Sequence, residues 1–246
     1  MTRRLLDRQS SLIHYLTSGA AIFNDAELQS VEPALQGIDR RLLGIEARFS
    51  FAKRMDKIAA VFPRTFDLLG ARREMLVKEF VEACPPFDIG RLENARQFFD
   101  FLTARWRREP PAPPHLPDVA ACELAFAAAR INVEDRSPVE KNRPGGARLP
   151  QVRRSPAVVL LRTTHDIRPL FEDASDAGPP IARDVPLAIV AQASADHPKI
   201  FELAPEVFDL LGSLGEWVDQ ALLDESEDAG ELITDLAAAG LVEIRH

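Results

Sequence analysis

The run His165-Asp166-Ile167-Arg168 places three functional groups close together in the sequence. An imidazole, a carboxylate and a guanidinium occur within four positions, shortly after the apolar run that ends at Leu161. Asp166 and Arg168 can pair with each other in a turn, with Phe171 buried. Alternatively, His165, Asp166 and Arg168 face a partner protein, where complementary charges fix the orientation of two surfaces. From the sequence, both interpretations stay open.

Side chains that bind metals or act as nucleophiles are scattered along the chain. Neither the five histidines nor the two cysteines, Cys84 and Cys122, recur at the short spacings of a zinc site. The sequence has no phosphate-binding loop, no dinucleotide fingerprint and no serine elbow. A group of carboxylates assembled only by folding stays an alternative. We therefore expect this chain not to be an enzyme by itself, and to hold no metal or cofactor of its own.

Charge is distributed unevenly along the sequence. The net charge is −8, and residues 184–246 contain 14 acidic and two basic side chains. Such a segment repels a phosphate backbone and attracts a basic partner. A winged-helix DNA-binding regulator is an alternative function, but it would need basic residues on its recognition helix, and residues 229–239 contain none. We expect no nucleic-acid partner.

The sequence also disfavours membrane insertion and secretion. No stretch of about 18 uncharged apolar residues occurs, which a membrane-spanning helix would need. Asp7 and Arg8 interrupt any signal-peptide core. We expect a cytoplasmic protein without membrane contact.

These residues need elements to position them, and residues 1–133 are predicted to form a helical domain. Apolar residues recur at helical spacing from Pro33 to Phe62, and Pro63 stops this run because it lacks the backbone N–H. A short helix that ends at Gly70 is predicted next. Further helices are predicted over residues 71–83, 92–108 and 117–130.

The rest of the chain is predicted to form a linker and a mixed domain. Residues 134–156 are predicted to be the linker, because proline and glycine recur there among charges. In residues 157–246, strands are predicted at 158–161, 185–193, 200–203 and 241–245, and helices at 205–211, 217–223 and 228–239. The predicted fold class is α+β, with an N-terminal helical bundle followed by a small winged-helix-like α/β domain.

Two parts of the chain resemble known families. The segments RMDKIAAVFPRTFDLLG (residues 54–70) and HLPDVAACE (residues 115–123) are similar to the helical domain of the HvfC-type maturation proteins. Residues 198–245 resemble the PqqD-like peptide-recognition domain, through the run FEL at 201–203, Trp217 and the run LAAAGLV at 236–242. The combination resembles the MbnC-type partner proteins of methanobactin biosynthesis, and related partner proteins of other ribosomal-peptide pathways.

The resemblance implies that two subunits share the work. The partner is then a TIM-barrel iron oxygenase, which holds the iron and modifies cysteine in a precursor peptide, in methanobactin to oxazolone and thioamide groups. This chain is expected to bind the leader of that precursor and to support the catalytic subunit. A structural adaptor that binds no peptide is the alternative.

The resemblance also implies where the leader binds. In PqqD-like modules the third strand and the third helix form the docking groove, and a leader strand can add to an open sheet edge. Each residue at these positions could instead be part of the core. The implied contacts are Ile200, Phe201, Glu202 and Leu203 in the strand, and Leu232, Ile233 and Leu236 in the helix.

Overall fold

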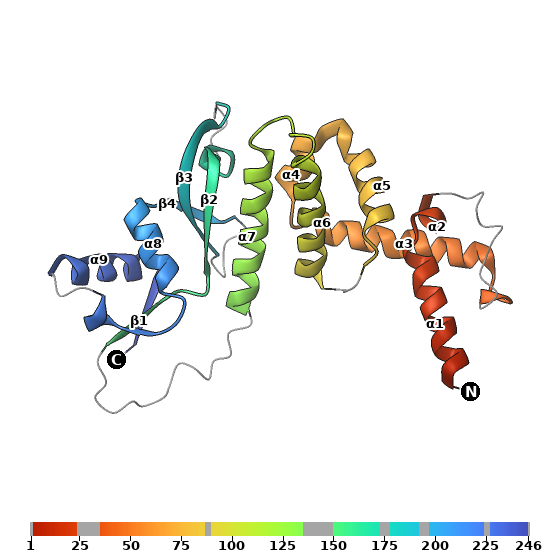
Figure 1. Ribbon diagram of the computed structural model, residues 1–246, viewed down its shortest axis with the longest axis horizontal. Coiled ribbons are helices and arrows are strands. Elements are labelled where there is room, and N and C mark those ends of the chain that lie inside the picture. The colour runs from red at the N-terminus through yellow and green to blue at the C-terminus, as the bar shows by residue number, and fades with distance from the viewer. Residues whose placement is uncertain are drawn as a thin grey trace. The chain divides into compact units, whose positions relative to one another are not determined.

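A computed structural model of the chain describes residues 2–23, 35–86, 90–134, 150–172, 178–191, 197–223 and 227–245. The protein is α+β and divides into two units, Met1–Pro113 and Pro114–His246 (Figure 1). The described part of the first unit is helical, and the second unit combines helices with two small antiparallel sheets.

The first unit contains six α-helices among its described residues. They are α1 (Thr2–Thr17), α2 (Gly19–Phe23), α3 (Arg40–Ala59), α4 (Pro63–Leu69), α5 (Arg73–Ala83) and α6 (Arg91–Trp106). The predicted stops at Pro63 and Gly70 are confirmed. Pro63 occupies the first turn of α4, where a missing N–H costs nothing, and Gly70 follows that helix with a φ of 52°.

Helix α3 begins later than predicted, at a capping residue that the apolar pattern did not reveal. The Asp39 carboxylate accepts hydrogen bonds from the backbone N–H groups of Arg41 and Leu42, at 2.8 and 3.4 Å. Two of the apolar residues that recur at helical spacing in this run, Ile45 and Phe49, are exposed rather than buried. The buried face of α3 runs instead through Leu43, Gly44, Ala47, Arg54 and Ile58.

A group of phenylalanines forms the centre of the first unit. Phe98 of α6 is fully buried, and its ring centroid lies 5.0 Å from that of Phe80, 5.5 Å from that of Phe66 and 5.9 Å from that of Phe62. These separations are typical of favourable aromatic pairs. The rings therefore join α4, α5 and α6 to the residues that follow α3.

The second unit begins with the long helix α7 (Leu116–Glu134). The strands and helices after it are β1 (Gln151–Arg154), β2 (Val158–Asp166), β3 (Ile181–Val190), β4 (Lys199–Glu202), α8 (Pro205–Ser213), β5 (Val218–Asp219), α9 (Glu227–Ala238) and β6 (Val242–Arg245). One sheet has the order β2-β3-β4 and the other has the order β5-β1-β6, and all pairs are antiparallel.

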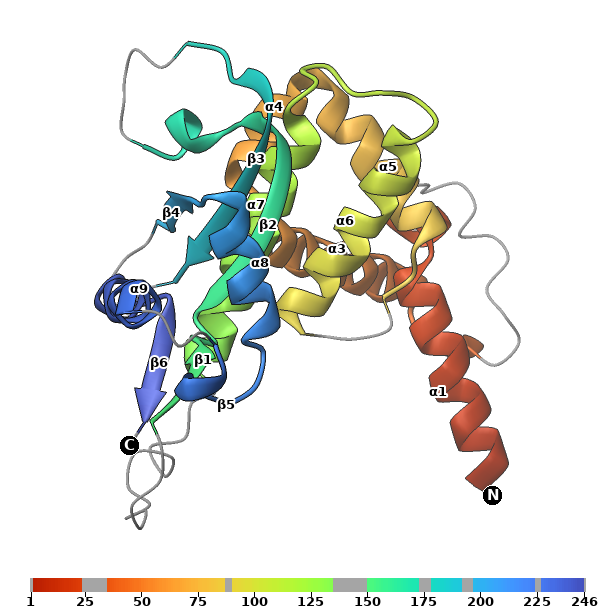
Figure 2. The same cartoon turned by 60° about the vertical axis from the view of Figure 1, so that its left-hand side comes forward.

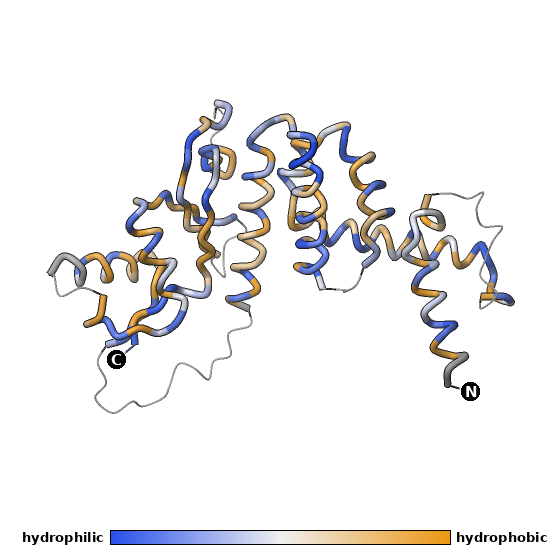
Figure 3. The backbone as a smooth tube through the Cα atoms, in the orientation of Figure 1, coloured by the Kyte–Doolittle hydropathy of each residue, from blue (hydrophilic) through white to orange (hydrophobic). Residues whose placement is uncertain are grey.

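Strand β3 is covered on both faces. Residues 185–190 are all buried. Ala188 and Val190 share a core with Leu211 of α8 and with α9. Side chains alternate along a strand, so Leu187 and Ile189 point to the opposite face, where α7 packs. Figures 1 and 2 show this sheet between α7 and α8, and Figure 3 shows that β2 changes from hydrophobic to hydrophilic along its length.

The predicted helix at 117–130 exists as α7, but it belongs with the second unit and not with the N-terminal helices. Its buried residues Leu116, Val119, Cys122 and Ala129 recur on one face. That face packs against β2 and β3, which explains the grouping. The division between the two units therefore falls between residues 113 and 114, whereas the sequence suggested a boundary after residue 133.

Two predictions in the C-terminal part are wrong. The predicted linker extended to residue 156, but residues 151–154 form β1; residues 135–149 of that linker lie outside the described part of the chain. The predicted helix at 217–223 is the short strand β5 followed by a 3₁₀ turn. Strand β5 pairs with β1. The Trp217 ring precedes β5, and its centroid lies 4.5 Å from the Cζ atom of Arg153 and 4.2 Å from that of Arg245.

Candidate functional site

The candidate site is the free edge of strand β4. This strand pairs with β3 on one side, and no other described strand pairs with its second side. The N–H of Leu203 donates to the carbonyl of Pro186 on β3, at 2.9 Å. Backbone groups alternate in direction along an antiparallel strand, so those of Ile200 and Glu202 point to the open side. An extended peptide could bond to them.

The seven residues implied in leader contact share one region of the molecule but differ in exposure. Leu203, Ile233 and Leu236 are buried in the core between the sheet and α9. Phe201 and Leu232 are partly buried against the same core, Ile200 is half-buried, and Glu202 is exposed. The structure therefore brings Phe201 and Leu203 of the strand set together with the three helix residues at one core. Of these residues, Ile200, Phe201, Glu202 and Leu232 keep exposed surface that a peptide could touch.

Four charged side chains form a cluster at the end of this strand. The Arg183 guanidinium donates to both oxygens of Glu202, at 2.6 and 2.8 Å, and also to Asp166. Arg168 donates to Asp166 at 2.9 and 2.7 Å and pairs with Glu202 at 2.6 Å. Residues from β2, β3, β4 and the turn after β2 are thus held together. Of these four residues, Asp166 and Arg168 are predicted from the sequence to face a partner protein, and Glu202 is implied in leader binding.

The cluster shifts the pKa values of its members. Hydrogen bonds from Arg168, and then from Arg183, hold the pKa of the Asp166 carboxyl well below its usual range. Hydrogen bonds from Arg183 lower the pKa of Glu202 as well. Asp166 and Arg168 do pair with each other, as the turn interpretation predicted. A role for His165, Asp166 and Arg168 in contacting a partner stays a prediction, and Phe171 is only half-buried.

A second polar cluster joins α7 to β2 inside the same unit. The buried carboxylate of Asp118 accepts hydrogen bonds from the backbone N–H and the hydroxyl of Thr164, at 3.2 and 2.9 Å. The same carboxylate also contacts His165 Nδ1, at 2.9 Å. The ring centroids of His165 and His115 lie 6.1 Å apart. Asp118 lies in the first turn of α7, where the helix dipole favours a negative charge.

The environment of His115 disfavours its protonated form. Burial lowers the pKa of His115, the nearby His165 lowers it further, and Asp118 acts in the opposite direction. Sequence reasoning missed this cluster, because Asp118 and Thr164 are separated by 46 residues and no short motif links them. The sequence offered His165 in the run at 165–168 and Asp118 at the start of a helix, but nothing that connected the two.

Chemically, this cluster resembles a carboxylate that orients an imidazole, and the Thr164 hydroxyl lies 3.0 Å from His165 Nδ1 and 2.9 Å from the Asp118 carboxylate. Among the described residues, no group of three histidine, cysteine, aspartate or glutamate side chains is placed to hold a metal ion. No described helix is both long enough and apolar enough to cross a membrane. The arrangement serves to fix α7 to β2, while the edge of β4 stays available for binding.

Comparison with known proteins adds no assignment: no family model matches this chain, and no curated protein matches it in sequence.

Proposed function

We propose that this chain is the non-catalytic partner of a TIM-barrel iron oxygenase in the biosynthesis of a ribosomal peptide of the methanobactin type. It binds the leader of the precursor peptide in the cytoplasm, and the partner holds the iron. The sequence resemblance to MbnC-type, HvfC-type and PqqD-like proteins suggests the class. The observation that carries the proposal is the open edge of β4, which lies on the same core as α9 in a unit that we interpret as winged-helix-like.

The leader adds to β4 as a further strand. Its backbone bonds to the N–H and C=O groups of Ile200 and Glu202, which point away from β3. Every second side chain of the added strand then lies on the face that holds Phe201 and Leu232, both partly buried against the core. Main-chain bonds supply affinity in this mode, and the side-chain contacts select the sequence.

The charge of this region favours a basic leader. Helices α8 and α9 contain no lysine or arginine, and their acidic side chains Glu206, Asp209, Glu231 and Asp235 are exposed. A negative surface attracts a basic peptide over a distance and accelerates its binding. The same absence of basic residues argues against the DNA-binding alternative.

The first unit offers a surface for the catalytic subunit. Large apolar side chains are exposed on α1 and α3, and these two helices pack against each other. Contiguous exposed apolar surface is typical of protein interaction sites, and these two helices supply six such side chains. The residues are Leu5, Leu6 and Ile13 on α1, and Leu42, Ile45 and Phe49 on α3.

A titration of the leader against an edge-blocked variant tests the strand-addition mode. Ile200→Pro removes the outward N–H that the leader would use, and an edge strand tolerates proline when that N–H faces solvent. Ile200→Val is the matched control, because it keeps the N–H and suits a strand. We expect fluorescence anisotropy with labelled leader peptide to show binding at least about tenfold weaker for Ile200→Pro, equivalent to about 1.4 kcal/mol.

Co-expression with the candidate iron-barrel subunit completes the test. We expect the two chains to co-purify as a heterodimer, with or without leader. Equal leader affinity for Ile200→Pro and Ile200→Val would contradict strand addition at β4. A heterodimer that binds no leader would favour the adaptor, and the absence of both interactions would contradict the proposal.

A further inference from the structure

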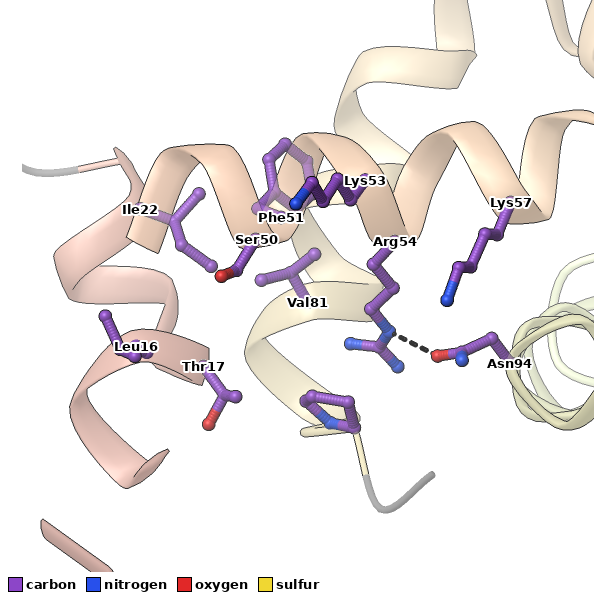
Figure 4. Close-up of a pocket in the computed structure, with 11 residues that line it drawn as sticks. Leu16, Thr17, Ile22, Ser50, Phe51, Lys53, Arg54, Lys57, Val81 and Asn94 are labelled. Atoms are coloured by element: carbon purple, nitrogen blue, oxygen red, sulfur yellow. Dashed lines mark hydrogen bonds between the residues drawn. The ribbon is translucent and has the colours of Figure 1, made fainter. Parts of the chain in front are cut away.

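The first unit contains a cavity that the proposed function does not use. Its volume is about 250 Å³, and it lies among α1, α2, α3 and α5, with Asn94 of α6 at one side (Figure 4). Much of its wall is apolar, with Leu16, Ile22, Phe51, Val81 and Pro86. Polar wall groups are Thr17, Ser50 and Asn94, and the charged ones are all cationic: Lys53, Arg54 and Lys57.

Arg54 is the unusual residue in this wall. It is only 9% exposed, although it carries a full positive charge. Its guanidinium donates to Asn94 Oδ1 at 3.0 Å, to the Cys84 carbonyl at 2.9 Å and to Gln97 Oε1 at 2.6 Å. It also lies over the Phe80 ring, 4.5 Å from the centroid. All these partners are electrically neutral.

The buried charge of Arg54 is therefore not balanced by a carboxylate within the described part of the chain. Burying a charge without a counter-ion is costly, and buried arginines in proteins are usually paired. Burial accordingly lowers the pKa of Arg54 to about 10. Three of the five guanidinium N–H groups have acceptors among the described residues, which leaves one on Nη1 and one on Nη2.

We propose that this cavity binds a small organic carboxylate with an apolar chain or ring, whose two oxygens accept the remaining N–H groups of Arg54. Guanidinium and carboxylate match in this two-point geometry. The three neutral acceptors and the Phe80 ring hold the guanidinium in place before the ligand arrives, which lowers the cost of binding.

The shape and the remaining charges of the cavity define the ligand further. A volume of about 250 Å³ has room for about eight waters of about 30 Å³ each, or for a ligand of about ten non-hydrogen atoms. The apolar wall residues receive the chain or ring of that ligand. Lys53 and Lys57 line the cavity from exposed positions, so they add positive potential for an entering anion.

Calorimetry on the full chain with three carboxylate probes tests the inference. The probes are hexanoate, octanoate and phenylacetate, and octanamide serves as the neutral match to octanoate. We expect at least one carboxylate to bind in a 1:1 ratio, and octanamide to bind at least about tenfold more weakly than octanoate, since only the charged head pairs with Arg54. This comparison examines the charge without altering the buried arginine.

A cavity-filling variant locates the binding site. Ser50→Phe places a ring in the cavity and leaves Arg54 intact, and Ser213→Phe makes the same change at an exposed position in the second unit. We expect Ser50→Phe to weaken carboxylate binding at least tenfold while circular dichroism stays that of a folded chain, and Ser213→Phe to bind as the wild type does. If Ser50→Phe unfolds, Thr17→Phe replaces it.

Three outcomes would overturn the inference. One is that none of the three carboxylates binds at millimolar concentration. Another is that octanamide binds as tightly as octanoate, which would make Arg54 irrelevant to the ligand. The last is that a folded cavity-filling variant keeps the wild-type affinity.

Discussion

His115 shows how one side chain can make the stability of this protein depend on pH. It is buried near His165, and burial is the main cause of its lowered pKa. A histidine exposed in an unfolded chain has a pKa of about 6.5. On acidification, the unfolded chain therefore takes up this proton before the folded chain does, and the free energy of unfolding falls.

We expect the free energy of unfolding to decrease as the pH falls through about 6.5, with a contribution from His115 of at most about 1.4 kcal/mol per pH unit. Urea denaturation between pH 8 and pH 5 measures this dependence. The His115→Gln variant keeps a polar side chain without a titrating group, so its curve should be flatter than that of the wild type over this range.

The matched control is His197→Gln. His197 is exposed, so the same substitution there should leave the pH profile of the wild type unchanged. A profile for His115→Gln that is as steep as the wild-type profile would contradict the assignment to His115. Protonation of Asp166 belongs to a more acidic range, because the pKa of that carboxyl is held well below its usual value.

Single residues also mark the limit of what the sequence could predict about the site. In the run at 165–168, the predicted pairing of Asp166 with Arg168 is confirmed. Arg183 and Asp118, which complete the two clusters, come from a strand and a helix that only folding brings near. Their partners lie 17 to 47 positions away along the chain, and no short spacing rule connects them.

At the scale of elements, the end of α9 depends on a single glycine. Gly240 has a φ of 76°, and its N–H donates to the Ala237 carbonyl at 3.0 Å. The N–H of Leu241 donates to the Leu236 carbonyl at 2.8 Å, which completes a Schellman motif. The sequence predicted this stop correctly, because glycine is the residue that adopts a left-handed conformation without strain.

We expect Gly240→Ala to lower the free energy of unfolding by about 1 kcal/mol, since an added Cβ disfavours the left-handed backbone by about 1–2 kcal/mol. Chemical denaturation measures the change. Gly212→Ala is the matched control in α8, where a Cβ would meet nothing within 4 Å. It should stabilise the protein by about 0.5–1 kcal/mol, because alanine is the better helix former. Equal effects at both positions would contradict the conformational explanation.

Local patterns predicted the elements that depend on local signals, and failed where tertiary pairing decides. Strand β1 has the sequence QVRR, which lacks an apolar run, and its stability comes from pairing with both β5 and β6. Residues 217–223 have a helix-like composition, but Val218 pairs with Val152 of β1. Such context outweighs intrinsic preference in short segments.

At the scale of the whole molecule, the division at residue 113/114 has a direct test. We expect a fragment of residues 114–246 to fold by itself, because it includes α7 and both sheets. A fragment of residues 134–246 lacks α7, so Leu187 and Ile189 lose the helix that covers their face of the sheet. Burying each such side chain contributes about 1.5–3 kcal/mol.

Circular dichroism and cooperative thermal unfolding would compare the two fragments. The longer one should unfold in a single transition, and the shorter one should aggregate or lack a transition. A well-folded 134–246 fragment would instead support the boundary suggested by the sequence, with α7 as part of the N-terminal domain.

The pairing of β1 with β6 has a consequence for how the protein is made. Gln151 and Arg245 are hydrogen-bonded partners 94 positions apart. A ribosome adds about 5–20 residues per second, so β1 waits about 5–19 seconds for β6. During translation, the nascent strand therefore exposes backbone groups that could pair with another chain. Arg153 and Arg154 place two like charges on β1. Two nascent copies of β1 therefore repel each other during the time in which β6 is still being synthesised.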